Sequence, residues 1–160
     1  MLDLAARLLP IAAPSITPTR SVREGRRAPR IIPADSGDDA FATAAREVRA
    51  LADEGLQVGC IAALTDVDET ERALTAEGVA HGVAERDGLG KPVTVLSAPE
   101  AKGLEFDAVV VVEPAAIAGD SARGLRLLYV ALTRPIQHLS IVHARPLPDA
   151  LTRVQEHERR

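Results

Sequence analysis

Two short segments in the C-terminal half of the chain carry the charged side chains best suited to holding a polyphosphate. The first contains Lys102, Gly103 and Glu105, and the second is an apolar run that ends in Arg134. An ammonium, a carboxylate and a guanidinium placed together can bind phosphate oxygens and ribose hydroxyls, because arginine offers a planar fork of donors and lysine a mobile point charge. The pattern therefore predicts a nucleotide-contacting site.

Each of these residues also has a simpler interpretation. Gly103 allows the backbone to pass close to a ligand, but Lys102 and Glu105 also fit a surface turn with a solvated ion pair. Arg134 ends a predicted helix, where a guanidinium stabilises the helix dipole without any ligand. Spacing alone leaves both interpretations open.

The sequence lacks other nucleotide and metal signatures. No G-x-x-x-x-G-K-[ST] pattern occurs, and Lys91 is followed by proline rather than by the hydroxyl residue that would hold magnesium. The chain is therefore not expected to cradle ATP phosphates by itself. The Val109 to Glu113 run resembles a strand ending in a magnesium-binding acid, but we interpret it as core strand plus turn. His138 and His143 would face opposite sides of a strand, so we expect no metal site.

Length and charge exclude several classes of protein. A chain of 160 residues fits one domain, and a net charge of -4 argues against a histone-like protein held to nucleic acid by its overall field. Aromatic residues make up 2%, too few for base-stacking platforms, so any nucleic-acid contact should be local. Cys60 is the only cysteine, which excludes an internal disulfide and predicts a buried small side chain.

No apolar run approaches the roughly 20 residues of a membrane span, and Asp3 and Arg7 interrupt the region where a secretory signal would be uncharged. We therefore expect a cytoplasmic protein without a membrane partner.

Hydrophobic periodicity predicts alternating strands and helices. A helix is expected from Asp38 to Glu54, with Ser36 at its start and Gly55 at its end. Thr65 and Asp68 fit a capping box before a second helix. The predicted elements are strands at 56–64, 79–84, 93–97, 109–112 and 139–143, and helices at 38–54, 65–78 and 122–133. This alternation predicts an α/β fold with a parallel sheet covered by helices on both faces.

The loop from Lys102 to Glu105 follows the predicted strand 93–97, so we expect it at the carboxyl ends of the strands, where ligands usually bind. Residues 1–14 resemble a truncated helix or linker, residues 15–147 form the predicted domain, and residues 148–160 form a charged tail or helix. A strand is also possible at 15–19. It precedes the one basic cluster, made of Arg20, Arg23, Arg26, Arg27 and Arg30.

The two segments together resemble motifs V and VI in the C-terminal RecA-like domain of superfamily 1 helicases of the UvrD/Rep type. Residues 97–107 are similar to motif V, and residues 127–139 are similar to motif VI with its YVALTR core. Residues 20–23 are similar to motif IV. Pro99 and Pro135 depart from the UvrD pattern and indicate the HelD-like branch, whose members act on RNA polymerase.

The resemblance implies a role for each matching residue. Arg134 and Arg23 would reach the γ-phosphate of ATP across an interdomain cleft, Glu105 would contact the ribose, and Lys102 and Gly103 would shape the loop. Ser97 takes the place of a threonine near the nucleic-acid backbone. ATP with Mg²⁺ would be held mainly by an N-terminal RecA-like domain carrying Walker A, with DNA as the track and RNA polymerase as a further partner.

These expectations describe the second motor domain of a helicase or translocase that hydrolyses ATP only together with its first domain. The alternative is a non-catalytic RecA-like module that binds protein or nucleic acid through the basic cluster between Arg20 and Arg30.

Overall fold

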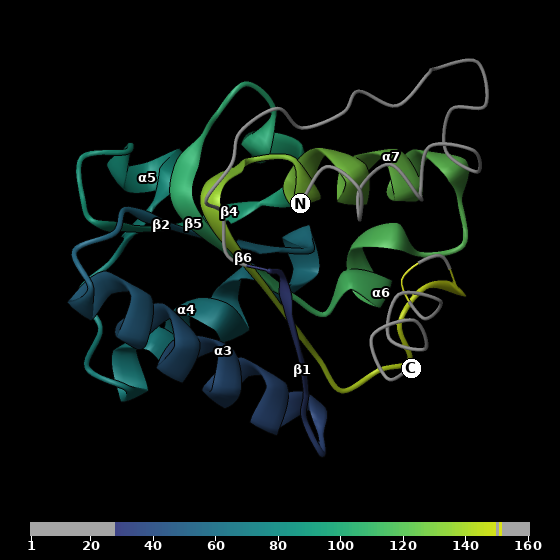
Figure 1. Cartoon of the computed structure of the whole chain (residues 1–160), viewed down its shortest axis with the longest axis horizontal. Coiled ribbons are helices and arrows are strands. Elements are labelled where there is room, and N and C mark those ends of the chain that lie inside the picture. The colour runs from purple at the N-terminus through teal and green to yellow at the C-terminus, as the bar shows by residue number, and fades with distance from the viewer. Residues whose placement is uncertain (1–27, 150, 152–160) are drawn as a thin grey trace.

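The computed structural model describes residues 28–149 and residue 151. Six parallel strands form one sheet in the order β1-β6-β5-β2-β4-β3 (Figure 1). The α/β prediction with a parallel sheet is confirmed. The elements are β1 (Arg30–Pro33), α3 (Gly37–Asp53), β2 (Val58–Ala62), η1 (Leu64–Asp66), α4 (Val67–Ala76), β3 (Gly82–Val83), α5 (Ala84–Asp87), β4 (Val93–Ser97), η2 (Ala98–Ala101), β5 (Phe106–Val112), α6 (Pro114–Ala118), α7 (Ala122–Leu132) and β6 (Pro135–His143).

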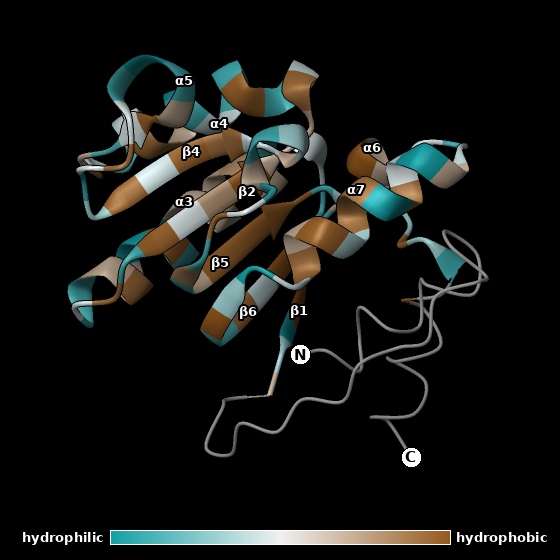
Figure 2. Cartoon of the chain, turned by 90° about the horizontal axis from the view of Figure 1, so that it is seen from above, coloured by the Kyte–Doolittle hydropathy of each residue, from teal (hydrophilic) through white to brown (hydrophobic). Residues whose placement is uncertain are grey.

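Side chains alternate between two apolar layers along the central strands, as the period of a β-strand requires. In β5, Val109 and Val111 pack with α6 and α7, whereas Val110 and Val112 pack with α3. Both faces are buried, so the central strands are apolar almost throughout (Figure 2). Helices therefore cover both faces of the sheet, as the sequence predicted.

Helix α3 begins and ends where its sequence predicted. The hydroxyl of Ser36 accepts a hydrogen bond of 3.2 Å from the N–H of Asp39, which satisfies one of the free donors of the first turn. Gly55, with φ of +85°, follows the helix in the left-handed region that favours glycine. Val48 and Leu51 are buried against the sheet, in agreement with the predicted apolar face.

The predicted capping box at Thr65 and Asp68 is wrong. Thr65 lies inside the short turn η1, which leads directly into α4, and no side chain caps either element. The backbone is already helical before α4 begins, so no extended N-cap position exists for Thr65 to occupy. A capping box is present instead at Ser97 and Glu100, at the start of η2.

Strands β5 and β6 begin earlier than predicted. β5 starts at Phe106 and β6 at Pro135, so each follows its charged segment directly. Pro135 is tolerated because it is the first residue of its strand. The consequence is that Glu105 and Arg134 are fixed at the beginnings of two strands rather than carried on free loops.

The expected position of the loop from Lys102 to Glu105 is also wrong in part. β4 and β5 are parallel with β2 between them, so the chain that leaves the carboxyl end of β4 at Ser97 must return along the sheet before β5 begins. Glu105 therefore lies at the amino-terminal edge of the sheet. Within the segment that joins β4 to β5, η2 lies at the carboxyl-terminal edge, where the loop from Lys102 to Glu105 was expected.

Several predictions concern parts of the chain outside the described residues. They are Arg23, the rest of the basic cluster before Arg30, the strand at 15–19, the segment 1–14, and nearly all of the tail at 148–160.

Candidate functional site

Glu105 and Arg134 lie side by side at the amino-terminal edge of the sheet. They immediately precede β5 and β6, which are adjacent and parallel, with Phe106 opposite Pro135. The N–H of Phe106 donates a hydrogen bond of 3.2 Å to the carbonyl oxygen of Arg134. Two residues far apart in the sequence are thereby held next to each other by the strand register.

The Arg134 side chain is half-buried and folds back on the C-terminal end of α7. Its Nε donates to the carbonyl oxygen of Val130 at 3.1 Å, and its Nη2 donates to Oγ1 of Thr133 at 3.1 Å. Among the described residues, Nη1 of Arg134 makes no hydrogen bond. The guanidinium is thus oriented by the protein while one edge of its fork is left for an anion.

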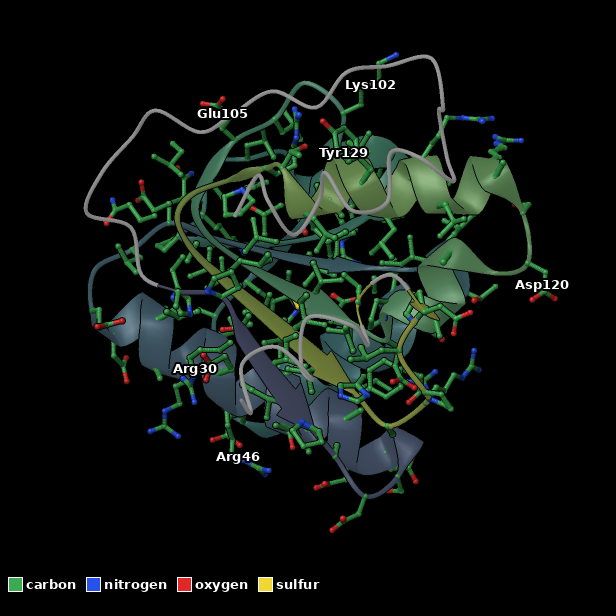
Figure 3. The ribbon with its side chains drawn as sticks, turned by 45° about the vertical axis from the view of Figure 1, so that its right-hand side comes forward. Arg30, Arg46, Lys102, Glu105, Asp120 and Tyr129 are labelled. Atoms are coloured by element: carbon green, nitrogen blue, oxygen red, sulfur yellow. The ribbon has the colours of Figure 1, made fainter. Side chains whose placement is uncertain are left out.

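Lys102 and Gly103 form an exposed turn after η2. Gly103 has φ of +82°, which only glycine adopts without strain, and a Cβ there would meet no atom within 4 Å. Conformation, rather than lack of space, therefore requires glycine at this position. Lys102 and Glu105 lie on the α7 side of the molecule together with Tyr129, whereas Arg30 and Arg46 lie on the α3 side (Figure 3).

Ser97 is remote from this pair, at the carboxyl-terminal end of β4. It is buried, with 2% of its surface exposed. Its hydroxyl donates a hydrogen bond of 2.7 Å to Oε1 of Glu100, and its N–H donates to the same oxygen at 3.3 Å. The structure therefore brings Glu105 and Arg134 together and leaves Ser97 at the other edge of the sheet.

Phe106 and Gly59 fix the start of β5. A Cβ on Gly59 would lie 2.6 Å from Cδ2 of Phe106, so the aromatic ring occupies the space that a side chain would need. Phe106 is buried, and this contact locks its backbone beside Arg134.

The acid at the end of β5 serves the fold. Glu113 is buried and adopts a left-handed conformation, with φ of +52°. Its Oε1 accepts hydrogen bonds from the N–H groups of Ala144 and Arg145, at 2.6 Å and 3.2 Å. Burial raises the pKa of nearby Asp66, an effect that Arg145 partly offsets. The interpretation of this segment as core strand plus turn is confirmed.

Neither a metal-binding cluster nor a membrane-spanning helix occurs among the described residues. Over residues 28–149, no group of three or more histidine, cysteine, aspartate or glutamate side chains is arranged to hold a metal ion. None of the helices described is both long enough and apolar enough to cross a bilayer.

Residues 92–142 match the model of the UvrD-like helicase C-terminal domain family. They include both charged segments, β4, β5, α7 and nearly all of β6. The similarity to this family covers about a third of the 160-residue chain.

Similarity to a solved structure extends over most of the remaining chain. The C-terminal domain of a possible DNA helicase from Lactobacillus plantarum WCFS1 superposes with a TM-score of 0.73 at 21% sequence identity. The match covers 95% of this chain and 90% of that one. The chain therefore has the α/β RecA-like fold. A search of curated proteins found no match.

Three residues of the site were not predicted from the sequence. Thr133 and Phe106 orient Arg134, and Glu100 engages Ser97. Ser97 and Glu100 have the S-x-x-E spacing of a capping box, so their pairing was visible in the sequence. The contact of Phe106 with Gly59 depends on strand order, and local sequence carries no signal for it.

Proposed function

We propose that this chain is the second motor domain of an ATP-dependent superfamily 1 DNA helicase or translocase. The observation that carries the proposal is the pairing of Glu105 and Arg134 at the starts of β5 and β6. The parallel register accounts for their adjacency, and a carboxylate beside a guanidinium suits a nucleotide with its ribose and phosphates. A nucleotide bound between two domains needs both groups on one face of the second domain.

In this proposal Arg134 binds the γ-phosphate and stabilises the charge that develops as it is transferred to water. Two bonds to α7 orient its guanidinium before any ligand binds, so little side-chain freedom is lost on binding. Arg23 supplies a second guanidinium. Glu105, which is exposed, accepts hydrogen bonds from the ribose hydroxyls.

Lys102 and Gly103 shape the loop that leads to Glu105. ATP with Mg²⁺ is held mainly by a first RecA-like domain that carries Walker A, because the present sequence has no such motif. Closure of the two domains brings Arg134 to the nucleotide, and reopening after hydrolysis moves the protein along its track.

The partners follow from the same proposal. DNA is the track, and its backbone approaches the domain near Ser97. Action on RNA polymerase, and the HelD-like branch that suggests it, stay predictions from the resemblance. We place the activity in the cytoplasm, consistent with a single cysteine that is buried and free.

The test uses a protein that carries both motor domains. It separates the role of Glu105 in nucleotide binding from the role of Arg134 in turnover. Glu105→Ala should weaken nucleotide binding by about tenfold because the ribose contact is lost, while turnover at saturating ATP changes little. Arg134→Ala should lower turnover at saturating ATP, while nucleotide binding changes little. If neither substitution affects binding or turnover, the shared edge is not a nucleotide site.

The rival binding module makes a different prediction. A domain that binds nucleic acid through the cluster from Arg20 to Arg30 should bind single-stranded DNA at low salt and release it at raised salt. If the isolated chain does not bind DNA at low salt, that module is excluded for nucleic acid.

A further inference from the structure

At the carboxyl end of β4, Ser97 has two hydrogen-bond donors, and the Glu100 carboxylate accepts a hydrogen bond from each. The hydroxyl and the N–H of Ser97 donate to the same Oε1 atom of Glu100, at 2.7 Å and 3.3 Å. Hydrogen bonds to an ionised carboxylate are short and strong compared with those between neutral groups. A phosphate could use the Ser97 hydroxyl only by displacing this carboxylate.

The charge of Glu100 also opposes a phosphate. A phosphate oxygen close enough to accept from Ser97 would lie beside a carboxylate that is only partly buried, and like charges at such distances repel. Arg145, at the same edge, is paired with the Glu113 carboxylate at 3.8 Å. Lys102 is exposed and lies on the α7 side of the molecule (Figure 3).

We propose that Glu100 is a specificity-determining residue that keeps nucleic-acid phosphate away from Ser97 at the carboxyl end of β4. This inference rests on the proposed function, in which Ser97 is the residue nearest to the nucleic-acid backbone. It adds that the Glu100 carboxylate lowers the affinity of the domain for nucleic acid at the carboxyl end of β4. A nucleic-acid backbone that approaches this edge then reaches the Ser97 hydroxyl only after Glu100 is displaced.

Two substitutions separate the charge of Glu100 from its hydrogen bonds. In Glu100→Gln the side-chain oxygen still accepts from Ser97, so the cap of η2 is kept while the negative charge is lost. In Glu100→Ala the hydroxyl of Ser97 is freed as well. The matched control is Asp53→Asn, which removes one negative charge from an exposed residue at the end of α3, near the opposite edge of the sheet.

The experiment is a fluorescence anisotropy titration of a labelled single-stranded oligonucleotide with the 160-residue chain, at low and at raised salt. Glu100→Gln should bind about tenfold more tightly than the wild type and Asp53→Asn, and the gain should disappear as salt rises. Glu100→Ala should gain at least as much, and Ser97→Ala in that background should remove part of the gain. Thermal melting of Glu100→Gln near that of the wild type shows that the fold is kept.

Two results would overturn the proposal. One is equal oligonucleotide affinity for Glu100→Gln and Asp53→Asn. The other is a wild-type chain whose binding is already weakened by Ser97→Ala, because the hydroxyl would then be open to phosphate. Neither result bears on ATP turnover, so failure here is distinguishable from failure of the proposed function.

Discussion

The hydroxyl of Thr133 accepts a hydrogen bond of 3.1 Å from Nη2 of Arg134 and donates one of 2.9 Å to the carbonyl oxygen of Val130. It therefore links the guanidinium to the last turn of α7. Because Nε of Arg134 bonds to the same Val130 carbonyl, two polar groups, themselves joined by a hydrogen bond, hold the arginine side chain in place. Thr133 is a positioning residue in this account and does not itself touch the nucleotide.

Removal of the Thr133 hydroxyl should loosen Arg134 without removing its charge. In a protein with both motor domains, Thr133→Val should lower kcat by about tenfold and leave KM nearly unchanged, because orientation matters most in the transition state. Thr133→Ser keeps the hydroxyl and should restore kcat. Steady-state ATPase kinetics of both variants check this, and equal kcat for Thr133→Val and wild type would show that the hydroxyl does not orient the arginine.

The contact between Gly59 and Phe106 should be sensitive to a single methyl group. Gly59→Ala places a Cβ within 2.8 Å of three ring atoms of Phe106, so the ring or the strand must shift. We expect a loss of about 1 to 3 kcal/mol in the free energy of unfolding, measured by urea denaturation of the isolated chain.

Two further variants test the cause of that loss. Gly37→Ala is the control, since a Cβ there meets no atom within 4 Å and the change should be neutral or slightly stabilising. Phe106→Leu combined with Gly59→Ala should recover part of the loss. If Gly59→Ala cost as much stability in the Phe106→Leu background as in the wild type, the steric explanation would be wrong.

The thiol of Cys60 should be inert in the folded protein. Complete burial raises its pKa from 9.0 to about 12, so it stays protonated at about pH 8 to 9, and only the thiolate reacts. A thiol-specific disulfide reagent should label Cys60 only after unfolding.

The same shift of the Cys60 pKa makes stability depend on pH. The raised pKa favours the folded state below pH 9.0, and that contribution is lost as pH rises from 9.0 toward 12, because the unfolded thiol ionises first. Cys60→Ala should therefore flatten the decline in the free energy of unfolding over this range. An unchanged slope would show that other groups cause the decline.

The elements that depend on local pattern could be predicted from the sequence, and those that depend on strand order could not. Ser36 and Gly55 delimit α3 through local capping chemistry, so its bounds were correct to one residue at each end. Glu105 was expected at the carboxyl edge because it follows β4, but its position is set by β5, on the far side of β2. Sequence proximity to one strand therefore misplaced a residue that belongs to another.

The candidate site shows the same division. Arg134 and Glu105 were recognised by residue type and by their surroundings in sequence. Their adjacency, and the way in which Thr133 and Phe106 secure it, depends on the register between β5 and β6. That register is a property of the folded sheet.

The measurement that tests the central claim most directly is ATP turnover and nucleotide affinity of Arg134 variants in a protein that carries both motor domains. Arg134→Ala should reduce turnover by about 10³-fold or more while nucleotide affinity changes little, and Arg134→Lys should restore only part of it because the planar fork is lost. Arg123→Ala, an exposed arginine at the other end of α7, is the matched control and should turn over ATP like the wild type. Wild-type turnover in Arg134→Ala would contradict the assignment of this arginine to the phosphate.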